Sequence, residues 1–145
     1  MICVDASVAA KWILPEERSE HALALLRETS RAGGWIVAPP LLPIEIANVI
    51  RRRMLRQCLS IDDARQLLSE FSDFMLHVIS PSDLSEQALI LADAHKLPAV
   101  YDAHYVALAS LLGCDLWTDD RRLVRTLSGS LPYVRWIGGY PIEHA

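Results

Sequence analysis

Short apolar segments alternate with longer stretches of helical character along the chain, and this alternation restricts the fold more than any other feature. The strand-like segments are residues 2–4, 35–38, 76–79, 116–117 and 134–137. Strands separated by helices usually pair in parallel, and helices then cover both faces of the sheet. The sequence therefore predicts an α/β fold, a three-layer α/β/α sandwich with a central, mainly parallel sheet. At 145 residues, we expect a single domain over 1–145.

Several helix positions can be predicted from local signals. Proline and two acids at 15–17 predict the start of a helix that ends at Gly33. Ser60 and Asp63 resemble a capping box, and apolar residues follow at helical spacing as far as position 75. The apolar residues around Glu45 predict a largely buried helix.

The composition limits the classes of function. Hydrophobic residues make up 52% and charged residues 22% of the chain, and no apolar run approaches the length of a membrane span, so we expect a cytoplasmic globular protein with no membrane contact. Three widely spaced cysteines indicate neither a disulfide framework nor a CxxC metal site. The net charge of −4 means that any contact with nucleic acid must come from local basic patches.

Four acidic positions would converge in such a fold: Asp5 after the first strand, Glu45 in a helix, Asp102 at a helix start, and Asp120 after the fourth strand. Carboxylates about 5 Å apart at an effective dielectric of about 20 repel by roughly 3 kcal/mol per pair. A cluster of this kind usually persists around a cation. The pattern therefore predicts a site for Mg²⁺ or Mn²⁺.

Each acid also has a structural alternative. The three aspartates all precede or begin helices, where a carboxylate can cap free N–H groups, although Ser7 could cap the first helix in place of Asp5. Glu45 could pair with Arg52, seven residues on and on the same helical face. We interpret the set as functional because all four alternatives would have to hold together.

Polar neighbours extend the predicted site. Thr118 could hydrogen-bond a carboxylate, and the adjacent Asp119 leaves open which of the pair is the fourth acid, with Asp120 preferred. The expected supporting residues are Ser7, Asn48, Thr118 and Asp119. Guanidinium groups near the acids would suit a phosphodiester substrate. The candidate phosphate contacts are Arg52, Arg121 and Arg122.

Four segments together resemble the PIN domain, and within it the VapC-type toxins of toxin–antitoxin pairs. They are Val4-Asp5-Ala6-Ser7-Val8, Glu45-Ile46-Ala47-Asn48, residues 101–109 and residues 117–123. The resemblance implies a toxin of a type II toxin–antitoxin system, a metal-dependent endoribonuclease that hydrolyses RNA phosphodiester bonds by a metal-activated water. It implies Mg²⁺ or Mn²⁺ held by Asp5, Glu45, Asp102 and Asp120.

The same resemblance implies a homodimer and a cognate, VapB-like antitoxin, for which we expect a docking groove between the helix at 16–32 and the Glu45 helix. Two other functions agree with these residues: a DNA-directed or structure-specific nuclease, and a catalytically silent PIN-like binding module. The sequence does not identify the RNA target. Its four tryptophans are expected in the core and not as base-stacking platforms.

Overall fold

Five short strands form one parallel sheet in a computed structural model that describes residues 1–143. The strands are β1 (Ile2–Val4), β2 (Ile36–Ala38), β3 (Leu76–Val78), β4 (Asp115–Thr118) and β5 (Val134–Trp136). Their order across the sheet is β3-β2-β1-β4-β5, and every neighbouring pair is parallel. The predicted parallel α/β architecture is confirmed.

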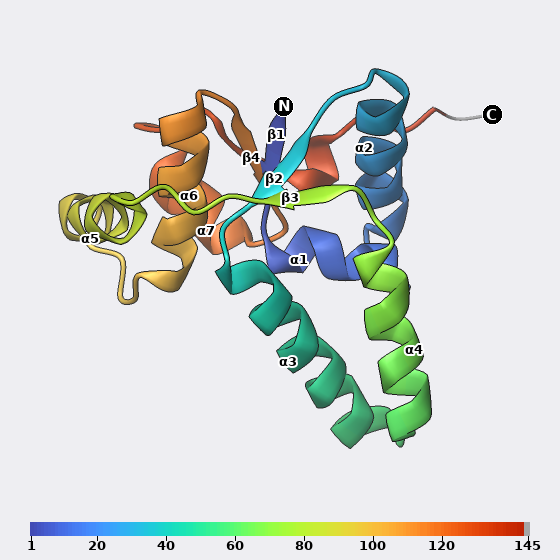
Figure 1. The fold of residues 1–145 in the computed structure, drawn as a ribbon. Coiled ribbons are helices and arrows are strands. Elements are labelled where there is room, and N and C mark those ends of the chain that lie inside the picture. Colours follow the sequence, from blue (N-terminus) through green and yellow to red (C-terminus); the bar gives the residue numbers. More distant parts are fainter. Residues whose placement is uncertain (144–145) are drawn as a thin grey trace.

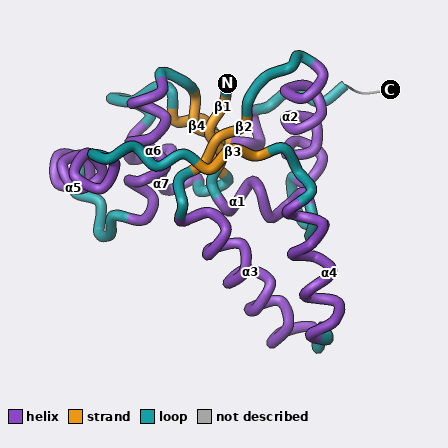
Figure 2. Tube along the Cα trace, viewed as in Figure 1, coloured by secondary structure: helices purple, strands orange, loops and turns teal. Residues whose placement is uncertain are grey.

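Helices connect all five strands. They are α1 (Ala6–Ala9), α2 (Ser19–Arg31), α3 (Leu41–Gln57), α4 (Ile61–Ser72), α5 (Leu84–Ala94), α6 (Tyr101–Leu112) and α7 (Arg121–Leu127), with 3₁₀ turns η1 (Ala10–Trp12) and η2 (Ile137–Gly139). Figure 1 shows α5, α6 and α7 on one side of the sheet and α1 and α2 on the other, which gives three layers. The α3–α4 hairpin projects away from the sheet (Figures 1 and 2). No helix within residues 1–143 is both long enough and apolar enough to span a membrane.

The sheet forms the centre of the core because both of its faces are covered. Cys3, Leu116 and Val134 lie in register across three strands and are fully or almost fully buried. The Cys3 thiol lies 3.8 Å from the carbonyl oxygen of Tyr105, so this face packs against α6. Val4, the next residue along β1, points to the opposite face and is also fully buried.

The chain reverses its direction of travel across the sheet beside β1. From β1 it proceeds to β2 and β3, and it then crosses back to β4 and β5. Val4 pairs with Trp117, so the carboxyl ends of β1 and β4 lie next to each other. Open parallel sheets bind ligands outside the carboxyl ends of the strands at such a reversal. Asp5 and residues 119–120 leave the sheet at this point.

The predicted helix start at 15–17 is wrong, because α2 begins only at Ser19. The backbone N–H of Glu16 donates to the Ser19 hydroxyl at 2.9 Å, and Arg18 has a left-handed backbone with φ of 65°. The segment is therefore a turn. Its local contacts, together with an ion pair from Glu16 to Lys11, replace the first turn of helix that the proline and the acids suggested.

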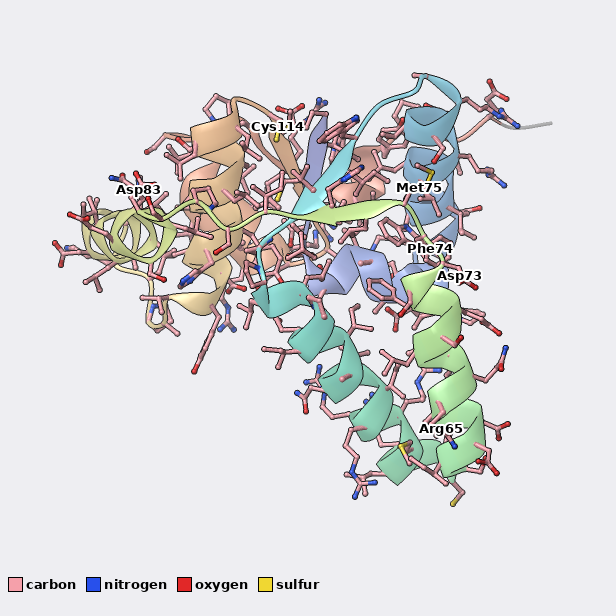
Figure 3. All side chains as sticks on the ribbon, in the orientation of Figure 1. Arg65, Asp73, Phe74, Met75, Asp83 and Cys114 are labelled. Carbon is pink, nitrogen blue, oxygen red and sulfur yellow. The ribbon has the colours of Figure 1, made fainter. Side chains whose placement is uncertain are left out.

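The predicted cap of α4 is confirmed, since the Ser60 hydroxyl accepts from the Asp63 backbone N–H at 3.0 Å. The helix ends at Ser72, however, so the helical spacing does not continue to Phe74 and Met75. Figure 3 labels both residues in the passage from α4 to β3, where Met75 is 83% exposed.

The helix that carries Glu45 is much less buried than predicted. Only Leu42, Ile46 and Ile50 are buried on α3, and Ile44 is 68% exposed. The reason is that α3 contacts the rest of the chain along one stripe and otherwise projects with α4.

The prediction for the four tryptophans is also partly wrong. Trp12 and Trp117 are buried, but Trp35 is 53% exposed and stacks on His77 with ring centroids 4.2 Å apart. Trp136 is only partly buried.

Candidate active site

Asp5 lies at the carboxyl end of β1 and is buried under a set of hydrogen bonds. Its Oδ1 accepts from the Val8 backbone N–H at 3.3 Å and from the Ser7 hydroxyl at 2.5 Å. Its Oδ2 accepts from the Thr118 hydroxyl at 2.5 Å. Asp5 therefore caps α1 itself, and the alternative in which Ser7 replaces it as the cap is wrong. Ser7 and Thr118 instead orient the Asp5 carboxylate.

Burial raises the pKa of Asp5 from 3.8 to about 7. The hydrogen bonds from Ser7 and Thr118 oppose this rise, while the charge of Asp102 adds to it. A buried carboxylate loses its hydration, and a nearby like charge penalises the ionised form further. The Asp5 side chain is therefore half-protonated near neutral pH in the metal-free protein.

Asp102 is the second residue of α6 and does not cap it, since the N-cap position is Val100. Its carboxylate has no hydrogen-bond donor within residues 1–143. Burial raises the pKa of Asp102, and the charge of Asp120 raises it further. The capping alternative thus does not explain Asp102.

Glu45 is half-buried on α3 and faces α6. The Tyr105 hydroxyl donates to Glu45 Oε1 at 2.7 Å. Burial raises the pKa of Glu45; the charge of Asp102 adds to this effect, and that of Arg52 opposes it. No ion pair within 4.0 Å joins Glu45 to Arg52 in the described part of the chain, so the pairing expected as an alternative is absent there.

Asp120 caps the next helix in the chain. Its Oδ1 accepts from the backbone N–H groups of Arg122 at 2.9 Å and Leu123 at 3.1 Å, and its own N–H donates to the Thr118 hydroxyl at 3.0 Å. The capping alternative therefore holds for Asp120. Its Oδ2 takes no part in these bonds.

Asp119 contacts two cations, and its carboxylate shares no partner with the acids described above. Lys11 Nζ lies 3.0 Å from its Oδ2, and Arg18 Nε lies 2.6 Å from its Oδ1. Trp136 Nε1 also donates to Oδ1 at 3.1 Å. Burial alone would raise the pKa of Asp119, but the hydrogen bonds from Arg18 and Lys11 outweigh it and hold that pKa below its usual value.

Sequence reasoning missed four side chains of this region: Lys11, Arg18, Tyr105 and Trp136. Lys11 is 5% exposed and stands alone among the six apolar residues of 8–14, which was the available signal for a buried ion pair. Tyr105 follows Asp102 by three residues, so both lie on one side of α6. No local pattern marks Trp136.

The remaining predicted residues lie at the periphery. Asn48 is exposed on α3 and makes no side-chain hydrogen bond with residues 1–143. Arg52, Arg121 and Arg122 are exposed, and none has a carboxylate within 4.0 Å among those residues. The guanidinium of Arg121 stacks over the ring of Trp136, 4.2 Å from its centroid.

The donor chemistry of Asp5, Glu45, Asp102 and Asp120, hereafter the acidic cluster, fits a divalent cation. Mutual repulsion contributes to the raised pKa values of Asp5, Glu45 and Asp102, so these groups share one electrostatic field. Within residues 1–143, no group of three Asp, Glu, His or Cys side chains is close enough together to enclose a metal ion. Mg²⁺ keeps several waters and commonly takes only one or two carboxylates directly, so a closed cage is not required.

Comparison with known proteins identifies the family and the relatives that this sequence resembles. The family model of the PIN domain matches residues 2–127. Ribonuclease VapC3 of Pyrobaculum aerophilum is 36% identical over 124 residues, which cover 84% of this chain and 91% of that protein. Ribonuclease VapC9 of Mycobacterium tuberculosis is 31% identical over 132 residues, covering 91% of this chain and 95% of that protein. Ribonuclease VapC12 of the same organism is 29% identical over 126 residues, covering 87% and 92%.

Proposed function

This chain belongs to the PIN-domain family, and we propose that it is the toxin of a type II toxin–antitoxin pair, a metal-dependent endoribonuclease that hydrolyses RNA phosphodiester bonds. The observation that carries the proposal is the acidic cluster at the reversal point of the sheet, in a chain whose relatives are named ribonucleases. Carboxylates there have no basic partner within 4.0 Å among residues 1–143.

We assign cation binding to Asp5 and Asp102, with Glu45 and Asp120 acting directly or through water. When bound, Mg²⁺ or Mn²⁺ supplies positive charge that polarises the scissile phosphate, lowers the pKa of a water and neutralises developing negative charge. Thr118 and Ser7 hold the Asp5 carboxylate in one orientation. Tyr105 does the same for Glu45. The protein's contribution is thus a fixed set of hard oxygen donors.

The ion pairs of Asp119 support Asp120 as the fourth acid. Both oxygens of Asp119 contact Lys11 or Arg18, so ligation by Asp119 would require breaking a largely buried ion pair. Asp120 keeps one carboxylate oxygen outside its capping bonds. In this arrangement Asp119 anchors the loop after β4, and its backbone N–H donates to Ser7 at 2.8 Å.

A groove along α3 suits the proposed antitoxin. It encloses about 160 Å³. Its lining consists of Ala47, Ile50, Arg51, Met54, Ile61, Ala64, Arg65 and Leu68. The second wall is therefore α4, and not the helix at 16–32 that the sequence suggested. Figure 3 shows Arg65 on α4 near the far end of the hairpin. Partner helices bind grooves of this kind with their apolar faces.

The proposed homodimer has a separate candidate face where α3, α5 and α6 begin. A hollow of about 500 Å³ lies there, lined in part by Ile44 and Tyr101, which are 68% and 63% exposed. Exposed apolar side chains grouped in this way commonly mark protein contacts. Light scattering of the wild type and of Tyr101→Arg tests this; we expect a dimer for the first and a monomer for the second, and a wild-type monomer would contradict it.

A cleavage assay tests the proposed reaction. Purified chain, free of any antitoxin, is incubated with total cellular RNA in Mg²⁺, Mn²⁺ or EDTA. We expect cleavage that requires metal and is lost in Asp102→Asn. Cleavage should persist in Asp62→Asn, because Asp62 is an exposed acid at the start of α4 and is not part of the acidic cluster. Cleavage of a matched DNA instead of the RNA would favour a DNA-directed nuclease. No cleavage of either substrate by a folded protein would favour the silent binding module.

A further inference from the structure

A basic and aromatic surface lies on α7 and β5 beside the acidic cluster. Arg121 and Arg125 stand one helical turn apart on α7 and so share a face. With Val124 and Trp136 they line a hollow of about 150 Å³. We call these four residues the Trp136 patch.

The Trp136 ring is held rigidly in this patch. Its Nε1 donates to Asp119 Oδ1 at 3.1 Å, and Asp119 is itself fixed by Lys11 and Arg18. The ring also lies directly against Gly138, where a Cβ atom would overlap the indole carbons. A ring with one edge bonded and one side enclosed cannot turn away without breaking these contacts.

This ring fixes the position of one guanidinium group. The Arg121 guanidinium carbon lies 4.2 Å from the Trp136 ring centroid, a distance at which the face of the ring attracts a cation. The Arg18 guanidinium lies 5.8 Å from the same ring, but its Nε already bonds Asp119. Arg121 is therefore the exposed cation whose position the Trp136 ring fixes.

The charges of Arg121 and Arg125 have no counter-charge within the described residues, where neither guanidinium has a carboxylate within 4.0 Å. Two adjacent guanidinium groups repel each other unless an anion lies between or above them. Guanidinium binds phosphate, like carboxylate, through two parallel N–H···O bonds, and phosphate is the anion that an RNA strand supplies.

The Trp136 patch also lies next to the residues that hold the acidic cluster. Trp136 pairs with Thr118 in the sheet, and neighbouring strands are about 4.8 Å apart. The Thr118 hydroxyl bonds Asp5, and Arg121 directly follows Asp120. The Trp136 patch therefore adjoins the residues to which we assign the scissile phosphate and its cation.

We infer that Arg121 and Arg125 bind the backbone phosphate of single-stranded RNA beside the scissile bond, and that Trp136 is a positioning residue for Arg121. This inference rests on the proposed ribonuclease function and adds a second site to it. Contact with phosphate carries no sequence information by itself, so the patch sets the register and affinity of the strand.

Salt-dependent RNA binding tests the inference. The probe is a fluorescein-labelled 12-nucleotide single-stranded RNA of mixed sequence, titrated with full-length chain in EDTA so that it stays intact. Each phosphate contact on a single strand contributes about 0.7 to the slope of log affinity against log salt. We expect Arg121→Gln and Arg125→Gln each to reduce the slope by about 0.7.

Arg135→Gln is the matched control. Arg135 also covers an indole, 4.6 Å from the centroid of Trp117, but it pairs with Asp115 at 3.1 Å and precedes Trp136 on β5, so it points to the other face of the sheet. The slope of log affinity against log salt for Arg135→Gln should equal that of the wild type.

A double variant tests the positioning role. Trp136→Leu should weaken binding in the wild-type background and have little further effect in Arg121→Gln, since two residues that act through one contact are not additive. Full additivity would overturn the positioning role. Wild-type slopes for both Arg121→Gln and Arg125→Gln, or an equal loss in Arg135→Gln, would overturn the patch itself.

The two levels of the argument fail separately. Metal-dependent RNA cleavage with unchanged slopes in the arginine variants would reject the Trp136 patch and leave the ribonuclease. Reduced slopes in a folded protein that cleaves no RNA would reject the hydrolysis and retain the patch as an RNA-binding site.

Discussion

Replacing Asp5 with Asn tests the electrostatics of the acidic cluster without RNA. Burial raises the pKa of this side chain from 3.8 to about 7 in the metal-free fold. Between these two values the native state binds more protons than the unfolded state, so the free energy of unfolding falls as pH rises. At 1.36 kcal/mol per pKa unit, the interval corresponds to about 4 kcal/mol of stability lost by pH 8.

Asn cannot ionise, so the variant escapes this loss. Its amide oxygen can still accept from Val8 and Ser7, but its NH₂ group replaces the oxygen that accepted from the Thr118 hydroxyl. Losing that hydrogen bond costs about 1 kcal/mol. We therefore expect Asp5→Asn to be more stable than the wild type by about 3 kcal/mol at pH 8, and no more stable below pH 4.

Urea unfolding followed by circular dichroism in EDTA, at steps from pH 4 to pH 8, measures this difference. Asp62→Asn serves as the control, because Asp62 is an exposed acid at the start of α4 and lies outside the acidic cluster. Parallel stability curves for wild type and Asp5→Asn across this range would refute the reasoning, since they would mean that Asp5 ionises in the fold as readily as in the unfolded chain.

Three further predictions concern the acidic cluster and the residues that surround it. Mg²⁺ at one hundred times its Kd should stabilise the wild type by about 2.7 kcal/mol and so raise its thermal midpoint in scanning fluorimetry. A similar rise in Asp102→Asn would contradict the proposed ligand set. Lys11→Met should lower the free energy of unfolding in urea by about 3–5 kcal/mol, because it removes one partner of the buried ion pair with Asp119. A loss below 1 kcal/mol would show that Arg18 alone neutralises the Asp119 carboxylate. Tyr105→Phe should cost about 1–3 kcal/mol in the same assay, since Glu45 loses its donor, and an unchanged midpoint would argue against that hydrogen bond.

Prediction from sequence succeeded where the signal is local or periodic. Five apolar segments became the five strands, and the Ser60 cap formed, because strand burial and helix capping depend on residues within a few positions of one another. Prediction failed where tertiary contacts oppose the local preference. The acids at 15–17 favour a helix start, yet Glu16 is drawn to Lys11 and the segment becomes a turn.

The sequence alone determined that the chain would build a parallel sheet and that Asp5 and Asp120 would leave it at the carboxyl ends of strands, because alternation and helix-start chemistry are written in neighbouring residues. Only the tertiary structure decided what each acid touches. Asp119 and Asp120 are adjacent and chemically identical, yet Lys11 and Arg18, more than 100 residues earlier, neutralise the first and leave an oxygen of the second outside its capping bonds. Such partners meet only after the strands have paired, because ionic contacts depend on distance in space and not along the chain.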